Sequence, residues 1–214
     1  MADFSLKAEP FLGSYHKNFG ALSLSEVTDR AIFSLAIPLG LETEVSNKIK
    51  SEFDINIPAI GRAAETRDGL ITMLRLGVDQ LFCFIDSEQE TNRAHAEFSS
   101  RLGGCVYTTD QSDVWVSLML SGNEVRKVLE RICPIDLHPS KFTVSCFART
   151  VMEHLGTIVY HHSDNGFTLM SASSSAKSFL HAIETSIETI LSVYRTYLYI
   201  IINIDLNISY HFVV

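Results

Sequence analysis

Two spacings of apolar residues alternate along the chain and predict its secondary structure. Runs of β-branched, aromatic and aliphatic residues bounded by turn residues are typical of strands, whereas apolar residues that recur every three or four positions indicate one face of a helix. The expected strands are residues 30–39, 63–66, 70–76, 80–85, 105–109, 114–120, 143–151, 156–161 and 166–170. The expected helices are residues 44–53, 87–102, 123–132 and 176–192.

The order of these elements predicts the fold class. A Gly77-Val78-Asp79 turn joins strands 70–76 and 80–85 into a hairpin, and Asp164-Asn165-Gly166 is the tightest turn signal in the chain. Strands 105–109 and 114–120 are expected to form a further pair. Strand, turn, strand and helix thus follow one another repeatedly, which is the order of split β-α-β units. We therefore predict an α+β fold in which helices cover one face of antiparallel sheets.

Shifts in composition divide the chain into three parts. Residues 1–25 contain Pro10, Gly13 and Gly20 and are expected to form an N-terminal arm lying on another surface. Residues 26–191 form the predicted domain, either as one unit or as two packed halves, 26–104 and 105–191. Residues 192–214 form an atypical C-terminal tail that is too polar for a membrane span. We expect the tail to continue the last helix or to add a strand, and to pack on its own domain or on a partner.

The net charge and the cysteines limit the classes of function that this chain is expected to have. The 214 residues carry a net charge of -8 and no basic run, which argues against a nucleic-acid-binding surface. The four cysteines are widely spaced and have apolar neighbours, as expected of buried free thiols in a reducing compartment. The N-terminal residues lack the basic segment and apolar block of a signal peptide. These features predict a cytoplasmic protein that binds neither nucleic acid nor membrane.

Residues with candidate chemistry are scattered and lie mostly at turns. The acidic and acid-histidine groupings are Glu65 with Asp68, Asp110 with Asp113, and Asp136 with His138. Carboxylates at turns are usually solvated, whereas acid-base catalysis needs them gathered in one cleft. Cys133 and His138 lack a third metal ligand at close spacing, and the adjacent residues His161 and His162 of a strand point to opposite faces. With no glycine-rich phosphate loop in the sequence, we expect no catalytic, metal or cofactor site in this chain.

Two single residues are candidates for a structural or interface role. Trp115, the one tryptophan of the sequence, lies in an alternating strand, where its large apolar surface favours the core or an interface. Arg149 is a charged residue in an otherwise strand-like run. Its planar guanidinium is expected to pair with a carboxylate, within the chain in preference to across an interface.

A longer set of residues resembles a known family. The set comprises Trp115-Val116-Ser117-Leu118, Gly122, Val128-Leu129, Cys133-Pro134-Ile135-Asp136-Leu137-His138-Pro139, Phe142 and Ala148-Arg149-Thr150. In this order it resembles the gamma subunit of heterotetrameric sarcosine oxidase, over residues 20–185, and the proline-bracketed Asp-Leu-His-Pro run is its most specific part. The chain departs from that family at Val78, where a proline is usual, and at residues 172–175, where an Arg-Ser pair is common.

The resemblance implies a fold like the folate-binding aminomethyltransferase domain and a place in a complex of alpha, beta, gamma and delta subunits. Such a complex oxidatively demethylates sarcosine to glycine and passes the one-carbon unit to tetrahydrofolate. Its FAD, FMN, NAD and zinc are held by the other subunits, so the resemblance implies an accessory, non-catalytic chain without a cofactor of its own. The alternative is an independent folate-binding or one-carbon-transfer module of the same fold, with Asp136 holding a pterin.

The prolines of the Cys133–Pro139 run give it a structural interpretation. Proline fixes its own backbone φ angle and restricts the residue before it. The run is therefore expected to set the positions of the helix before it and the strand after it. On this basis Asp136, His138 and Pro139, together with Trp115 and Arg149, are predicted to be structural or interface residues.

Overall fold

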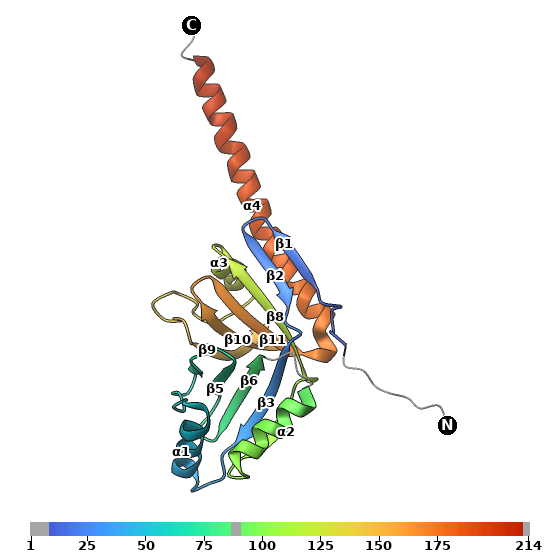
Figure 1. The fold of residues 1–214 in the computed structure, drawn as a ribbon. Coiled ribbons are helices and arrows are strands. Elements are labelled where there is room, and N and C mark those ends of the chain that lie inside the picture. The colour runs from blue at the N-terminus through green and yellow to red at the C-terminus, as the bar shows by residue number, and fades with distance from the viewer. Residues whose placement is uncertain (1–8, 87–90, 212–214) are drawn as a thin grey trace, which may run out of the picture.

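The computed structural model describes residues 9–86 and 91–211, which form two antiparallel sheets flanked by helices (Figure 1). The strands are β1 (His16–Phe19), β2 (Leu22–Glu26), β3 (Arg30–Ala36), β4 (Ala63–Glu65), β5 (Ile71–Arg75), β6 (Gln80–Asp86), β7 (Tyr107–Asp110), β8 (Trp115–Gly122), β9 (Phe147–Met152), β10 (Leu155–Ser163) and β11 (Gly166–Ala172). The helices are α1 (Glu42–Phe53), α2 (Thr91–Leu102), α3 (Val125–Glu130) and α4 (Ala176–His211), with a 3-10 turn, η1 (Ser173–Ser175), before α4.

One sheet, called the β8 sheet below, has the strand order β1-β2-β8-β11-β10-β9. Alternation along β8 places Val116, Leu118 and Leu120 on one face, in the same core as residues of α3 and α4. Helix α4 contributes Phe179 and Ile183 to this core at helical spacing, and both are fully buried. The opposite face of β8 carries Trp115, Ser117 and Met119, and Trp115 packs against residues of the other sheet.

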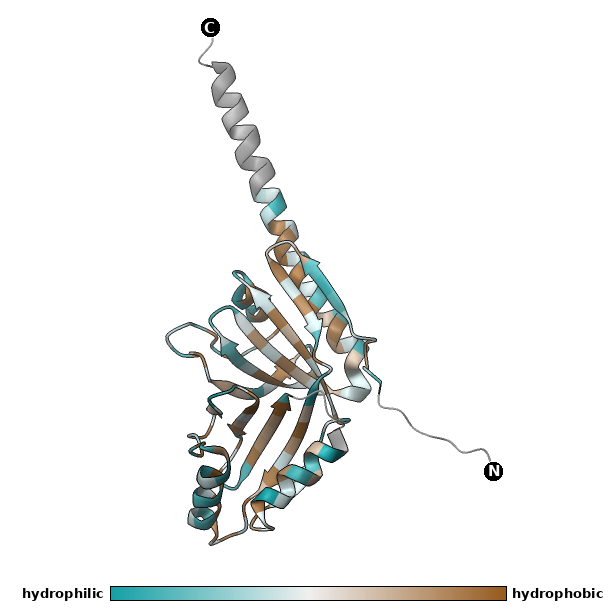
Figure 2. Ribbon diagram, viewed as in Figure 1, coloured by the Kyte–Doolittle hydropathy of each residue, from teal (hydrophilic) through white to brown (hydrophobic). Residues whose placement is uncertain are grey.

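The other sheet, called the β3 sheet, has the strand order β4-β5-β6-β3-β7. Helices α1 and α2 cover one of its faces, where Phe33 of β3 packs with Ile49 of α1 and Phe98 of α2. The rings of Phe53 and Phe98 stack at 5.0 Å between these two helices. The outward residues of α1 and α2 are hydrophilic, as Figure 2 shows, so each helix buries a single apolar stripe.

The two sheets meet through their helix-free faces. A third apolar cluster joins Ile32, Phe82 and Phe84 of the β3 sheet to Ile158 and Met170 of the β8 sheet. The layers therefore run helices, sheet, sheet, helices, with a contact between sheets at the centre of the molecule (Figure 1). This arrangement confirms the predicted fold class, because each antiparallel sheet carries its helices on one face.

The described part of the predicted N-terminal arm contains two strands of the β8 sheet. Residues 1–8 lie outside the described residues, but β1 and β2 form a hairpin that joins the β8 sheet, with Leu24 opposite Leu120. Phe19, Leu22 and Leu24 are buried in the core of that sheet. Strand β2 therefore pairs with β1 on one side and with β8 on the other.

The predicted halves, 26–104 and 105–191, do not match the sheets. Strand β7 pairs with β3, while β8 pairs with β2 and β11, so the expected pairing of strands 105–109 and 114–120 is wrong. The chain enters the β8 sheet, leaves it to build all five strands of the β3 sheet, and returns after β7. The other expected hairpins, β5–β6 and β10–β11, are confirmed. Residues 87–90 of the expected helix 87–102 lie outside the described residues.

The predicted tail is a continuation of the last helix. Helix α4 runs without interruption from Ala176 to His211 and extends past the β8 sheet (Figure 1); residues 212–214 lie outside the described residues. Val193 and Tyr197 of the tail are exposed, so they do not pack on its own domain, and the alternative, packing on a partner, stays a prediction. The Tyr194 hydroxyl still contacts α3 and its cap, donating to Glu124 at 2.7 Å and meeting Lys127 Nζ. Among the helices that the structure describes, none offers an apolar stretch of the length that crossing a membrane requires.

Candidate functional site

Polar side chains gather at one end of the contact between the sheets. Arg30 and Asp86 lie opposite each other on β3 and β6. The Arg30 guanidinium donates from Nε at 2.5 Å and from Nη2 at 2.9 Å to the two carboxylate oxygens of Asp86. It also lies over the Phe84 ring, 5.1 Å from the centroid. A two-pronged ion pair and an aromatic face thus fix the orientation of this guanidinium.

A tyrosine and a histidine of β10 lie beside this ion pair. The Tyr160 hydroxyl donates a 2.6 Å hydrogen bond to Glu65 Oε1 of β4. Burial, and then the bond to Glu65, raise the pKa of Tyr160 well above its usual range. Burial and the nearby Arg30 charge lower the pKa of His162, whose Nδ1 lies 3.2 Å from Thr168 Oγ1. Both side chains are therefore uncharged at neutral pH.

A pocket of about 120 Å³ opens next to this polar group. Its inner wall consists of the buried residues Ile32 and Ser117 and the half-buried residues Arg30 and Trp115. Its rim comes from three segments, residues 9–11, residues 26–28 and residues 112–113. The rim segment 9–11 is anchored by Glu26, whose carboxylate accepts hydrogen bonds from the backbone N–H groups of Leu12 and Ser14 at 3.0 and 2.9 Å.

Three buried polar atoms of the pocket residues lack a hydrogen-bond partner within residues 9–86 and 91–211: Arg30 Nη1, Trp115 Nε1 and Ser117 Oγ. Ser117 as a whole is 4% exposed. The Trp115 ring is held by an edge-on contact with Phe82 at 5.8 Å. Each of these atoms can donate a hydrogen bond, and each is buried beneath the pocket surface, in a residue of one or the other sheet.

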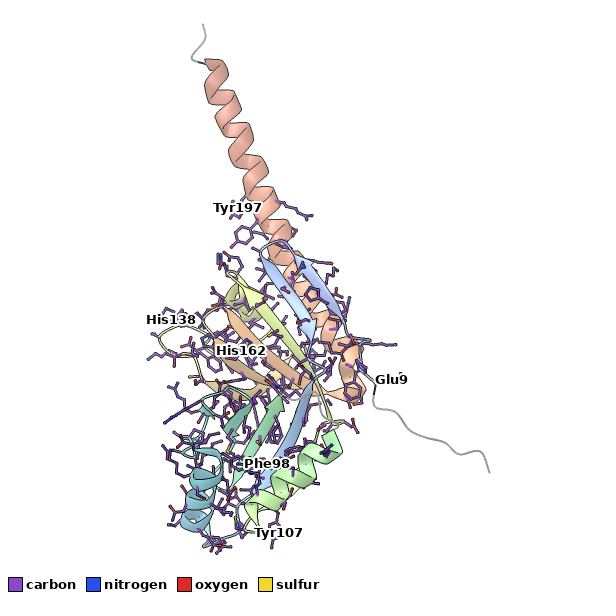
Figure 3. All side chains as sticks on the ribbon, viewed as in Figure 1. Glu9, Phe98, Tyr107, His138, His162 and Tyr197 are labelled. Atoms are coloured by element: carbon purple, nitrogen blue, oxygen red, sulfur yellow. The ribbon has the colours of Figure 1, made fainter. Side chains whose placement is uncertain are left out.

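The other predicted residues lie elsewhere. Asp136, His138 and Pro139 are exposed on the connection between α3 and β9, and Figure 3 shows His138 on this outer loop, away from His162. Asp136 Oδ1 accepts a hydrogen bond from the backbone N–H of His138 at 2.9 Å, and His138 Nδ1 lies 2.8 Å from Ser140 Oγ. These local contacts stabilise a turn, and the structure does not bring the three residues to the pocket.

The position of this connection depends on a residue that the sequence analysis missed. The Arg126 guanidinium of α3 donates hydrogen bonds to the carbonyl oxygens of Leu137 and Phe142. It also lies over the Phe167 ring at 5.2 Å and 3.3 Å from His161 Nε2. An arginine in a short amphipathic helix gives no sequence signal of this role, because its partners are backbone oxygens.

Arg149 is exposed on β9, the edge strand of the β8 sheet. In the part of the chain that the structure describes, it forms no ion pair, so the expected pairing within the chain is not found there. Val151, two residues along the same strand, is 50% exposed. The pairing of Arg149 across an interface stays a prediction.

The remaining candidate groups have structural partners. Asp68 accepts a hydrogen bond from the Thr66 hydroxyl at 2.6 Å, and Asp110 accepts one from the Ser112 hydroxyl at 2.7 Å, both within turns. His161 and His162 do point to opposite faces: His161 stacks on Phe167 at 4.5 Å and His162 lies near Tyr160 at 6.2 Å. All four cysteines are free thiols, and burial raises the pKa of Cys83. No three metal-binding side chains meet among the residues described.

Comparison with known proteins identifies the fold. No protein-family model and no curated protein matches the sequence. Among solved structures, a chain of the heterotetrameric sarcosine oxidase from Corynebacterium sp. U-96, in complex with pyrrole 2-carboxylate, is similar with a TM-score of 0.68 and 19% identity, covering 80% of this chain and 87% of that one. The glycine cleavage system aminomethyltransferase T from Bartonella henselae is similar with a TM-score of 0.58 and 11% identity, covering 74% of this chain and 44% of that one. The chain thus shares their fold and spans less than half of the aminomethyltransferase.

Proposed function

We propose that this chain is an accessory, non-catalytic subunit of a sarcosine-oxidase-type complex, equivalent to the gamma subunit of the heterotetrameric enzyme. In that role it supports the oxidative demethylation of sarcosine to glycine with transfer of the one-carbon unit to tetrahydrofolate. The observation that carries the proposal is the extent of the structural match, which spans 80% of this chain and 87% of a chain from such a complex. A match over nearly the whole of both chains favours a whole subunit over one domain of a larger enzyme.

The proposed partners are the alpha, beta and delta subunits, and FAD, FMN, NAD and zinc are assigned to those partners. The contact surface that we propose is the free edge of β9. Arg149 supplies an exposed cation there, and Val151 supplies exposed apolar area at 50%. An edge strand also offers backbone N–H and C=O groups for pairing with another chain. Because the chain has a net charge of -8, Arg149 gives this edge a local charge opposite to that of the whole molecule.

Co-expression tests the proposal directly. The full chain is produced with candidate alpha, beta and delta subunits, and the eluted complexes are analysed by size-exclusion chromatography with light scattering. The expected result is a stoichiometric four-chain complex that produces peroxide when sarcosine is added. A matched co-expression that omits this chain is expected to give an incomplete assembly. A stable, fully active complex that excludes this chain when it is present contradicts the proposal.

The likeness to the aminomethyltransferase favours a second candidate function, an independent folate-binding module. The chain covers 44% of that protein, so it corresponds to only part of the aminomethyltransferase fold. Calorimetric titration of the isolated chain with tetrahydrofolate distinguishes the two functions. Tight binding supports the folate module, and its absence together with complex formation supports the accessory subunit.

A further inference from the structure

We propose that α4 packs antiparallel along the α4 helix of a second copy of this chain, through its projecting segment, residues 193–211. Helix α4 is continuous to His211, and Figure 1 shows this segment extending away from the other elements that the structure describes. The inference assigns a partner to the C-terminal tail. It goes beyond the proposed function and does not depend on it, because it concerns the isolated chain.

The first argument is an apolar stripe that runs along α4 from the domain into the projecting segment. Four residues of the stripe belong to the core of the β8 sheet or pack against it: Leu180, Ile183, Ile187 and Ile190. The same alternating spacing of three and four positions continues in the sequence through Tyr194, Tyr197, Ile201, Ile204 and Ile208. Apolar residues at this seven-residue repeat are typical of helices that pack along one another.

The second argument is that the projecting segment has little to stabilise it as a single helix. Seven of its nineteen residues are β-branched and four are tyrosines, and such residues have weak helix propensity. Its two charged residues, Arg195 and Asp205, are ten positions apart, too far to pair on one helix. At its base, Val193 and Tyr197 are 44% and 63% exposed. Because helices in proteins owe most of their stability to the packing of an apolar face, the stripe needs a partner surface.

The third argument is the distribution of charge, which favours the antiparallel orientation. Arg195 and Asp205 are the charged residues of the tail 192–214 and cancel each other, so the net charge of -8 belongs to residues 1–191. Parallel helices would hold two acidic domains side by side, where they repel each other. Antiparallel helices hold the two domains at opposite ends of a segment about 28 Å long. That distance is several times the Debye length of about 8 Å at physiological salt.

The same two charges favour a second copy as the occupant. When Tyr194 of one antiparallel helix lies level with Ile204 of the other, the residues of the two stripes meet along the segment. Arg195 directly follows Tyr194, and Asp205 directly follows Ile204, so both charges lie on the same side of the stripe. In this register Arg195 of each copy lies within about 3 Å, along the helix axis, of Asp205 of the other. The two-fold symmetry of a homodimer forms this opposite-charge pair twice.

Sedimentation equilibrium of the full chain over a dilution series tests the interface. The expected result is a mass that rises with concentration from 23.9 kDa to twice that value. Tyr197→Asp places a charge on the stripe and is expected to weaken dimerisation at least about tenfold. Thr196→Asp is the matched control, because Thr196 is exposed, adjacent and outside the stripe. A monomer at every concentration overturns the proposal, even if α4 then binds another protein, and so does equal weakening by the two variants.

Exchange of the two charges tests the orientation and the occupant. Arg195→Glu alone and Asp205→Arg alone each bring like charges together across an antiparallel dimer, and each is expected to weaken dimerisation about threefold or more. The double variant restores opposite charges at both places and is expected to recover the affinity of the unchanged chain. In a parallel dimer each charge meets its own copy, so the single variants would not weaken it. Unweakened single variants, or a double variant that stays weak, overturn the antiparallel pairing.

Folding and subunit assembly are controlled separately. Arg195, Thr196 and Tyr197 are exposed, so thermal unfolding of their variants, at a concentration where the chain is monomeric, is expected to match that of the unchanged chain. A variant that matches it has lost association without loss of the domain fold. Because dimerisation is measured without alpha, beta or delta subunits, its failure leaves the assembly test of the proposed function unaffected, and the reverse also holds.

Discussion

Tyr160 of β10 and Glu65 of β4 form a 2.6 Å hydrogen bond that joins the two sheets. Tyr160 is 2% exposed, whereas Glu65 is exposed. The bond therefore closes the edge of the apolar contact between the sheets, with its donor in the interior and its acceptor at the surface. Its effect on stability is open to measurement through both mutation and pH.

Tyr160→Phe is expected to lower the free energy of unfolding by about 1.5 kcal/mol, the lower end for a bond to a charged group because Glu65 is solvated. The raised pKa of Tyr160 adds a pH dependence. In the unfolded chain the phenol ionises near pH ~10, while in the folded protein it stays protonated to higher pH. Stability from this group is thus complete below pH ~10 and falls above it by about 1.4 kcal/mol per pH unit. Urea unfolding at pH 8 and 10.5 checks this.

The substitution Tyr107→Phe provides the control, because Tyr107 is 72% exposed. We expect it to change stability by no more than about 0.5 kcal/mol. The loss of stability at high pH is expected to be smaller in Tyr160→Phe than in the unchanged protein. If Tyr160→Phe and the unchanged protein lose the same amount of stability as the pH rises, Tyr160 ionises normally in the folded state.

Arg126→Met is expected to destabilise the protein by about 2–4 kcal/mol, since it leaves the carbonyl oxygens of Leu137 and Phe142 without their donor. His138→Ala is expected to change stability by no more than about 0.5 kcal/mol, because the side chain is exposed and contacts only its own turn. Chemical denaturation of the two variants measures both effects. A larger loss for His138→Ala than for Arg126→Met would restore the structural role that the sequence assigned to His138.

Gly122→Ala tests the approach of β2 to the end of β8. Gly122 has a φ angle of +129°, and an added Cβ would lie 2.1 Å from the Ala21 carbonyl oxygen. The substitution is expected to cost about 2 kcal/mol or more through backbone strain and overlap. Gly156→Ala is the matched control, since no heavy atom lies within 4 Å of its added Cβ. Similar thermal unfolding of the two variants would mean that the β1–β2 hairpin shifts without cost.

Val151→Asp and Arg149→Glu test the proposed contact surface of β9. Each introduces an anion on the exposed edge, and each is expected to weaken assembly with the co-expressed subunits by about tenfold or more. Val78→Asp is the control, because Val78 is 67% exposed at the β5–β6 turn, outside β9. Size-exclusion profiles at equal concentrations compare the variants. Loss of assembly in Val78→Asp, or its retention in both β9 variants, places the contact elsewhere.

The helices and strands of this fold can be predicted from the sequence, but the strands that pair with each strand cannot. The β5–β6 and β10–β11 hairpins follow from tight turns between apolar runs, so their pairing can be predicted from adjacent residues alone. Strand β7 and strand β8 are also consecutive, yet they join different sheets. Alternation indicates which side chains of a strand face a core, and it says nothing about which core that is.

The candidate site illustrates the same limit. Trp115 stands out in the sequence because it is the only tryptophan, and the structure places it in the pocket wall. Ser117 appears as one polar residue in an apolar run, and Arg30 follows the polar residues Thr28 and Asp29 at the start of another. Neither pattern indicates a pocket. Their significance arises from the contact between two sheets. Arg149, which the sequence singled out, lies on an edge away from that pocket.

The interleaved order of the strands has a consequence for the synthesis of the chain. As the polypeptide leaves the ribosome, β2 emerges long before β8, the strand that pairs with it through Leu24 and Leu120. Until then Leu22 and Leu24 remain in water on an unpaired edge, which can join the same segment of another nascent chain. Translation that stops before residue 115 is therefore expected to yield an aggregating product, and chaperone protection is needed most while residues 27–114 are being made.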